Sequence, residues 1–347
     1  MFIVDYDPIL PSFIHSLSRQ EKKNRDDYCG HHFWRQTVKI LVTGGAGYIG
    51  TALLDALSHD SRDIDELIVY DNLSRKNHNF FLGSAISPSA TIRFIQGDIL
   101  DTRRLERAMD GVEVVIHLAA RVTTPFSSAD PHLFEQVNHW GSAELSYILE
   151  RSESIKQLIY LSSTAVYGSS GGAASHTTAP MPQSWYGTSK LRGEKMLERL
   201  SDRMAVHIIR CGNVYGYSRS MRFDAVINRF VFEAHFTGRI SIHGDGDQGR
   251  AFIHIDHAAR ALSALIGDDL PSGVYNLIDR NATITEIAAE LRELIGELEM
   301  IYIEQDMPRH NLMVRPDPRI LARGWFTQRP LREELVAFRR QLAFAPK

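Results

Sequence analysis

Short apolar runs alternate with helical patterns along most of the chain between residues 38 and 210. The apolar runs predict strands over residues 38–43, 66–71, 91–96, 113–118, 155–161 and 205–210. Apolar residues at helical spacing predict helices over residues 48–59, 102–109, 131–151 and 186–201. This alternation favours an α/β fold with a doubly wound parallel sheet and helices on both faces. Ligands bind beyond the carboxyl ends of such strands, so we expect the functional residues there.

A glycine-rich turn joins the first predicted strand to the first predicted helix. Gly44, Gly47 and Gly50 lie in this turn. Gly44 permits a tight turn, Gly47 leaves room for a phosphate, and Gly50 lets the helix pack closely on the strand. The free N–H groups and the dipole at the start of the helix predict a pyrophosphate site.

A carboxylate ends the second predicted strand. Asp71 lies 21 positions after Gly50, a spacing typical of the acidic residue that accepts ribose hydroxyls and repels a 2′-phosphate. We therefore expect NAD rather than NADP, although Arg75 and Lys76 lie nearby. The alternative is a tight turn without a ligand, which does not explain why the three glycines and Asp71 coincide.

A Tyr-x-x-x-Lys pair opens the fourth predicted helix. Tyr186 and Lys190 share one helical face. A cation about 4 Å from a phenol, at an effective dielectric near 20, favours the phenolate by about 4 kcal/mol, so the pair can act as a base. Ser163, after the fifth strand, can donate to the same substrate oxygen. An exposed pair on an amphipathic helix is the alternative, and the dinucleotide turn favours the catalytic interpretation.

Together these segments resemble the extended short-chain dehydrogenase/reductase family, the NAD-dependent nucleotide-sugar epimerases and dehydratases. The resemblance runs from about residue 38 to the end of the chain. It is carried by residues 43–50, 71–74, 97–99, 117–120 and 162–168 and by Tyr186-x-x-x-Lys190. It implies a Rossmann-type domain, NAD as the cofactor, and Tyr186, Lys190 and Ser163 as the catalytic set.

The resemblance also implies the residues that bind each ligand. The implied NAD site comprises Gly44, Gly47, Tyr48, Ile49, Asp71, Asn72, Asp98, Ile99, Leu118, Ala119, Ala120, Tyr186 and Lys190. The implied substrate residues are Thr124, Ser163, Asn213, Arg250 and Arg309. Asn138 resembles a structural asparagine of the family.

The implied domain organisation has two parts and an extension. Residues 37–212 form the NAD-binding Rossmann domain, with a strand or helix returning from the later chain. Residues 213–347 form mainly a smaller substrate-binding α/β lobe, to which we assign the predicted strand 273–277. Residues 1–36 are an N-terminal extension without an assigned role. The resemblance also implies a homodimer that is formed through the helices at 131–151 and 186–201.

The two residues after Ser163 distinguish between reactions. Dehydratases of the family carry an Asp–Glu pair there, and decarboxylating relatives carry a Glu at the second position, whereas this chain has Thr164 and Ala165. We therefore expect an epimerase that inverts C4 of a UDP-sugar through a transient keto intermediate, with Tyr186 as the base. The alternatives are an NAD(P)H-dependent nucleotide keto-sugar reductase, an atypical sugar-nucleotide dehydratase and a non-catalytic NAD-binding regulatory protein.

Composition excludes several classes of partner. The 347 residues have a net charge of −3, which gives no strong field for nucleic acid or an anionic membrane. We find no apolar run near the ~20 residues that span a bilayer and no signal-peptide layout. Two cysteines are too few for a disulfide framework, so we expect a cytoplasmic protein. The His254-x-Asp256-His257 sequence could suggest a metal, but the family segment accounts for it, so we expect none.

Overall fold

The computed structural model describes residues 37–58, 62–82, 91–122, 130–169, 172–304 and 311–344. These residues belong to one compact unit that spans Gln36–Lys347. The predicted extension 1–36 and two predicted substrate residues, Thr124 and Arg309, lie outside the described residues.

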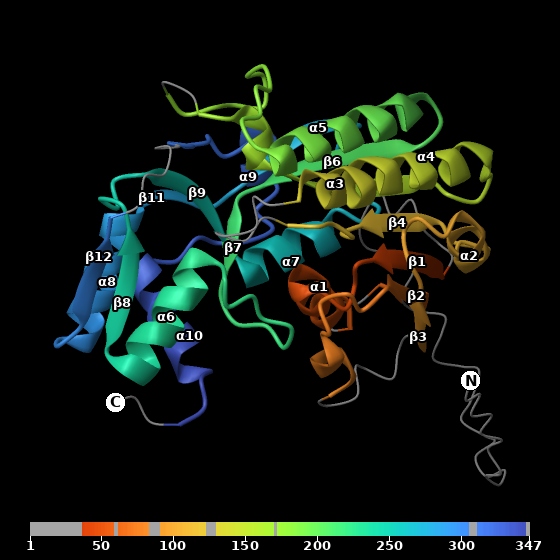
Figure 1. Cartoon of the computed structure of the whole chain (residues 1–347). Coiled ribbons are helices and arrows are strands. Elements are labelled where there is room, and N and C mark those ends of the chain that lie inside the picture. Colours follow the sequence, from red (N-terminus) through yellow and green to blue (C-terminus); the bar gives the residue numbers. More distant parts are fainter. Residues whose placement is uncertain are drawn as a thin grey trace, which may run out of the picture. The chain divides into compact units, whose positions relative to one another are not determined.

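A seven-stranded sheet with every neighbouring pair parallel forms the centre of this unit (Figure 1). In spatial order its strands are β3 (Thr91–Gln96), β2 (Ile64–Asp71), β1 (Val38–Thr43), β4 (Val114–His117), β5 (Gln157–Ser163), β6 (Ala205–Cys211) and β10 (Gly273–Leu277). The six strands expected from the apolar runs are confirmed, and so is the doubly wound α/β fold.

The assignment of strand 273–277 to the small lobe was wrong. This strand is β10, which pairs with β6 at the edge of the large sheet. Tyr275, Asn276 and Leu277 are all buried, as expected of a strand whose two faces are both covered. A helix of the later chain, α7 (Ile255–Ala264), also packs on this part of the molecule, against α1 (Tyr48–Ser58).

Two hydrophobic cores lie on opposite faces of the sheet. One joins Leu53 and Leu57 of α1 to Ala261 and Leu262 of α7. The other holds Leu105 of α2 (Thr102–Ala108), Leu145 of α4 (Gly141–Arg151) and Leu197 of α5 (Trp185–Glu198). The alternate residues of the buried strands divide between these cores, which is why their sequences are almost continuously apolar.

The predicted helix at 131–151 contains a π-helical segment. It begins as α3 (Pro131–Phe134), widens through η2 (Glu135–Trp140), and continues as α4. The buried Asn138 lies in the wide turn. Its Oδ1 accepts from the N–H of Arg121 at 2.8 Å, and its Nδ2 donates to the Arg121 carbonyl at 2.9 Å and to Ser189 Oγ at 3.0 Å. Asn138 therefore ties the segment after β4 to α5.

The smaller lobe is built on two further sheets. One contains β7 (Asn213–Tyr215), β9 (Gly249–His254) and β11 (Arg280–Thr283), and the other contains β8 (Arg239–His243) and β12 (Glu299–Ile303). The helices of this lobe are α6 (Val226–Thr237), α8 (Ile284–Ile295) and α10 (Leu331–Arg340). Phe230, Ile287 and Leu335 join these helices in a third core.

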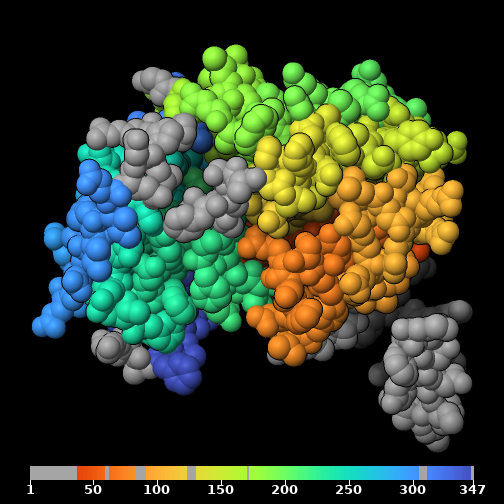
Figure 2. All heavy atoms as spheres, in the orientation of Figure 1, coloured from red at the N-terminus to blue at the C-terminus, as the bar shows by residue number. Residues whose placement is uncertain are grey.

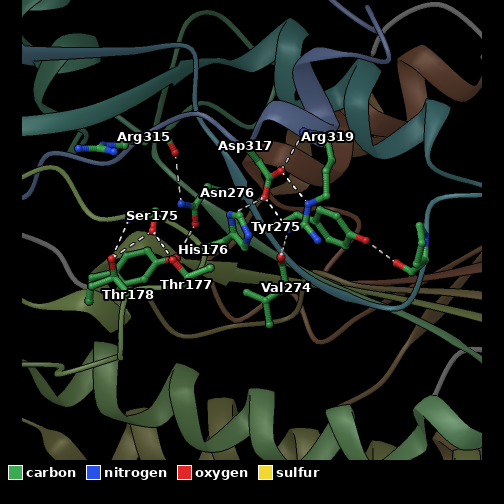
Figure 3. Close-up of polar contacts among 12 residues, drawn as sticks. Ser175, His176, Thr177, Thr178, Val274, Tyr275, Asn276, Arg315, Asp317 and Arg319 are labelled. Carbon is green, nitrogen blue, oxygen red and sulfur yellow. Dashed lines mark hydrogen bonds and ion pairs between the residues drawn. The ribbon is translucent and has the colours of Figure 1, made fainter.

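Polar contacts attach the segment after residue 311 to β10 and to the loop before α5 (Figure 3). Asp317 Oδ2 lies 2.8 Å from Arg319 Nη2 and 3.5 Å from His176 Nδ1. The Asn276 amide donates to the Arg315 carbonyl at 3.2 Å. These contacts hold that loop beside the carboxyl ends of the strands. The remaining short helices are η1 (His78–Phe81), η3 (Thr164–Tyr167), η4 (Arg199–Asp202) and α9 (Pro318–Leu321).

Candidate active site

A cavity of about 860 Å³ lies beyond the carboxyl ends of β1, β2, β4 and β5, within the size range of ligand sites. Residues of both the large sheet and the smaller lobe line it, and Figure 2 shows these two parts adjoining on one face. The predicted site residues that line it are Gly44, Gly47, Tyr48, Ile49, Asp71, Asn72, Ile99, Leu118, Ala119, Ala120, Ser163, Tyr186, Lys190, Asn213 and Arg250. Asp98 is not among the lining residues, but its Oδ2 accepts from Asn72 Nδ2 at 2.8 Å.

The glycine turn has the backbone geometry that its sequence predicts. Gly44 has φ +70°, and a Cβ there would lie 2.6 Å from the backbone nitrogen of Ala119. A Cβ on Gly50 would lie 2.4 Å from the Gly45 carbonyl oxygen, so only glycine allows α1 to pack this closely. The first turn of α1 carries no acidic residue and has N–H groups without partners in the helix. These features fit a pyrophosphate.

The Asp71 carboxylate links the glycine turn to the end of β2. Its Oδ2 accepts from the N–H of Ala46 at 3.1 Å, and its Oδ1 accepts from the N–H of Leu73 at 2.8 Å. Burial raises the pKa of this carboxyl group, and the two backbone hydrogen bonds lower it. A carboxylate offers about four acceptor positions, so two remain for ribose hydroxyls. The local structure therefore fits the adenosine end of NAD.

Tyr48 makes a contact that sequence reasoning missed. Its buried hydroxyl donates to the Gly216 carbonyl at 2.6 Å and accepts from Asn228 Nδ2 at 3.1 Å. Burial raises the pKa of this phenol, so it stays protonated and can donate. Tyr48 thus joins the start of α1 to the segment after β7, a contact between residues too distant in sequence for any local pattern to reveal.

The three predicted catalytic residues come together at the end of β5. Tyr186 lies in the first turn of α5, where Ser184 caps the helix by accepting from the N–H of Gly187 at 3.0 Å. Ser163 ends β5, and its hydroxyl lies close enough to Tyr186 to lower the pKa of the phenol. Lys190 is 1% exposed, and its Nζ lies 4.2 Å from the centre of the Tyr160 ring.

The electrostatics of Tyr186 differ from the prediction in one respect. Burial raises the pKa of the phenol, while the hydrogen bond with Ser163 and the charge of Arg222 lower it. Burial also lowers the pKa of Lys190 to about 7, against the opposing charge of Glu194. Burial therefore opposes the lowering of the phenol pKa that the sequence predicts from Lys190.

A family model described as the NAD dependent epimerase/dehydratase family matches residues 40–277, which is more than half of the chain. This chain belongs to that family. It is therefore an NAD-dependent enzyme of the epimerase/dehydratase type, and the resemblance to the extended short-chain dehydrogenases/reductases is confirmed.

The individual relatives include both epimerases and dehydratases. An uncharacterized UDP-glucose epimerase of Bacillus subtilis is 33% identical over 238 residues, which are 66% of this chain and 73% of that protein. Human dTDP-D-glucose 4,6-dehydratase is 28% identical over 75% of this chain and 74% of its own length. The structure of UDP-glucuronic acid 4-epimerase from Bacillus cereus, in complex with UDP-glucuronic acid and NAD, is similar with a TM-score of 0.76 and 26% identity, over 87% of this chain and 98% of that one.

Sequence reasoning also missed Arg222, which lines the cavity. It follows β7 in an irregular segment, where no periodic pattern marks it. Its Nη2 lies 2.5 Å from Asp224 Oδ2, and Arg75 Nη2 lies 3.7 Å from Asp224 Oδ1. The positive charge near Tyr186 therefore comes partly from a residue outside the predicted set.

Of the possible metal ligands in 254–257, His257 lies in a buried ion-pair cluster. His257 Nδ1 lies 2.8 Å from Asp279 Oδ2, and Arg280 Nη2 lies 2.7 Å from Glu334 Oε2. His257, Asp279 and Glu334 lie close enough to hold an ion, but Arg280 pairs with both carboxylates. The expectation of no metal stays a prediction. None of the helices in the described ranges is long and apolar enough to cross a bilayer.

Proposed function

We propose that the protein is a nucleotide-sugar epimerase that inverts C4 of a UDP-sugar through a transient keto intermediate. The observation that carries this proposal is the absence of an acid–base pair beside Ser163. Thr164 is buried in η3, and Ala165 lines the cavity. Among the described residues that line the cavity, the only carboxylates are Asp71, which bonds to the glycine turn, and Asp224, which pairs with Arg222. Neither follows Ser163 in the way that a dehydratase requires.

In this proposal Tyr186 and Ser163 both contact the C4 hydroxyl of the substrate, and Tyr186 transfers its proton. Both residues line the cavity, and the Ser163 hydroxyl acts on the phenol of Tyr186, so one substrate oxygen can contact both. Tyr186 accepts the hydroxyl proton as the carbonyl forms, and Ser163 donates to the oxygen. NAD, which Gly44, Gly47 and Asp71 would hold in the cavity, would supply the acceptor for the C4 hydride and its donor on return. Tyr186 then gives the proton back to the inverted hydroxyl, so the reaction is redox-neutral.

The test is to incubate the purified protein separately with UDP-hexoses and UDP-uronates and to analyse the products by NMR and mass spectrometry. An isobaric C4 epimer supports the proposal. Loss of water or of carbon dioxide contradicts it, and so does consumption of added NADPH with reduction of the sugar. Acid release of NAD from the purified protein is the accompanying measurement, because an epimerase that borrows and returns a hydride needs no exchange of its cofactor.

Replacing Arg250 with methionine is expected to raise the KM for a UDP-sugar by about 10- to 100-fold, since a hydrogen bond to a charged group contributes about 1.5–3 kcal/mol. Arg250 lines the cavity, and burial lowers the pKa of its guanidinium. In the described part of the chain its side chain donates only to the Gly249 carbonyl, at 3.4 Å, so it remains available for a diphosphate. Arg332→Met, which removes an exposed arginine paired with Glu293, is the control. An unchanged KM in Arg250→Met would exclude this role.

The homodimer stays a prediction, and its proposed surface carries exposed aromatic side chains. Trp140 of η2, Tyr147 of α4 and Trp185 of α5 are each at least half exposed. We expect light scattering of the purified protein to give twice the mass of the chain, and Trp140→Glu with Tyr147→Glu to give the mass of a single chain. A monomeric wild type would contradict the predicted assembly.

A further inference from the structure

A buried ion pair lies directly behind the predicted catalytic residues. Glu194 and Arg210 are 3% and 5% exposed. The ion pair is bidentate: Arg210 Nε donates to Glu194 Oε1 at 3.0 Å, and Arg210 Nη2 donates to Glu194 Oε2 at 2.7 Å. Ser162 Oγ donates to the same Oε1 at 2.5 Å. The carboxylate thus accepts three hydrogen bonds from groups of two other elements, β5 and β6.

The pair is placed by the same periodicities that place the catalytic set. Tyr186, Lys190 and Glu194 follow one another at intervals of four on α5, so they share one face of the helix. On the sheet, Ser162 of β5 lies opposite Arg210 of β6. Ser162 precedes Ser163, and the carboxylate therefore holds the strand end that carries the predicted catalytic serine.

Stability alone does not account for this pair. Removing two charges from water costs several kcal/mol for each ion, and well-packed apolar residues often replace such pairs without loss. Arg210 also lies 4.8 Å from the centre of the Tyr167 ring, and the Tyr167 hydroxyl donates to Asn276 Oδ1 at 2.6 Å. The Tyr167 ring thus also contacts the guanidinium, so that both charges of the pair are held by neighbouring side chains.

The surroundings of Lys190 contain few charges that can influence it. Its Nζ lies over the Tyr160 ring. On β4 it acts on His117, whose pKa burial and Lys190 together lower to about 3, so that imidazole is neutral. On α5 the neighbouring groups are Tyr186 and Glu194, and Glu194 is the group that opposes the effect of burial on the pKa of Lys190.

We propose, on the basis of the function proposed above, that Glu194 and Arg210 are positioning residues for the reaction. Glu194 keeps Lys190 in its charged form and, through Ser162, fixes the end of β5 at Ser163. Arg210 holds the carboxylate in place and limits its field at Lys190. The balance of the two charges then sets the pH range over which the Tyr186–Lys190 pair can accept a proton.

The two partners are expected to act in opposite directions on the pH profile. Glu194→Gln removes the anion and leaves the Arg210 cation unpaired, so the pKa of Lys190 falls and its charge is lost at lower pH. The alkaline limb of kcat then moves down by about one pH unit, the size of shift that a nearby charge produces. Arg210→Gln removes the cation and leaves the Glu194 anion, so the same limb moves up. If the pair has only a structural role, both variants should lose activity, and the alkaline limb of kcat should stay in place or move in the same direction in both.

Arg210→Lys keeps the positive charge but loses the paired hydrogen bonds of the guanidinium, so it tests the effect of geometry without a change of charge. We expect the alkaline limb of its kcat profile to stay at the wild-type pH. If Arg210→Gln does not fold, the comparison of Glu194→Gln with Arg210→Lys decides. An unmoved limb in Glu194→Gln overturns the proposal, and so does an equal shift in Arg210→Lys.

A second readout needs no substrate. In the NAD-loaded protein, the phenolate absorbance of Tyr186 is titrated with the Tyr186→Phe protein as the blank, and we expect the phenolate to form at higher pH in Glu194→Gln than in wild type. Because this titration does not depend on the sugar, a wrong assignment of the reaction would leave it unchanged. An unaltered titration in Glu194→Gln would refute the positioning role while leaving the epimerase proposal intact.

Discussion

Tyr186→Phe is expected to lower kcat by about 10²- to 10⁴-fold, the usual contribution of a positioned general acid–base group. The change removes one oxygen from a half-buried side chain in the first turn of α5 and leaves the aromatic contact with Phe134, whose ring centre lies 6.1 Å away. Packing, bound NAD and the unfolding temperature should therefore stay close to those of wild type. The loss should appear in kcat rather than in KM, because the proton is transferred only during the chemical step.

The matched control is Tyr147→Phe, which removes a hydroxyl from a half-exposed tyrosine of α4 outside the cavity. Its kcat should equal that of wild type when both are measured at saturating UDP-sugar. If Tyr186→Phe keeps more than a tenth of the wild-type kcat, Tyr186 is not the base. If Tyr186→Phe also supports the full cellular function, a non-catalytic, NAD-binding role becomes the better explanation.

The large sheet could be predicted from the sequence because its signals are local. Each buried strand is a short apolar run, and each helix on its faces has apolar residues at regular spacing, so one pass along the chain finds both. The glycine turn and Asp71 follow the same strands. Their roles could be predicted because a positive φ at Gly44 and a carboxylate at a strand end are each determined by a few adjacent residues.

The remaining features depend on contacts between distant residues. Strand 273–277 carries no sign of which sheet it joins, and its pairing with β6 depends on tertiary packing. The π-helical turn at 135–140 is decided by Asn138, which bonds to Arg121 and Ser189 outside that helix. Arg222 enters the cavity from an irregular segment. A pattern of period two or 3.6 contains none of this information.

The contacts between the glycine turn and the smaller lobe suggest how the two ligand sites are coupled. Beside the Tyr48–Gly216 bond, the Thr51 and Ser218 hydroxyls lie 2.6 Å apart, and Ser218 Oγ donates to the Tyr48 carbonyl at 3.1 Å. Asn228 of α6 accepts from the N–H of Gly216 at 2.9 Å. The segment that follows β7 toward the proposed substrate lobe is therefore bonded directly to the helix that starts at the pyrophosphate turn. A shift of this turn should disturb both sites.

Gly44→Ala is expected to have the largest effect on stability and NAD binding. A left-handed residue other than glycine costs about 1–2 kcal/mol. At Gly44 the new Cβ would also lie 2.6 Å from the Ala119 nitrogen and 2.7 Å from its Cα, and relieving such overpacking costs about 1–3 kcal/mol more. The backbone of the turn or of the segment after β4 must move, and both line the cavity. We expect urea unfolding to show a loss of about 2–5 kcal/mol, with little further stabilisation on addition of NAD.

Gly238→Ala separates the two causes of this loss. Gly238 follows α6 with φ +69°, almost the same as the +70° of Gly44, but a Cβ there would meet nothing within 4 Å. It should lose only the backbone contribution of about 1–2 kcal/mol and keep the full stabilisation by NAD, because that stabilisation depends on affinity for the folded state. If Gly44→Ala and Gly238→Ala lose the same free energy and respond equally to NAD, then the close approach of the turn to Ala119 does not shape the NAD site.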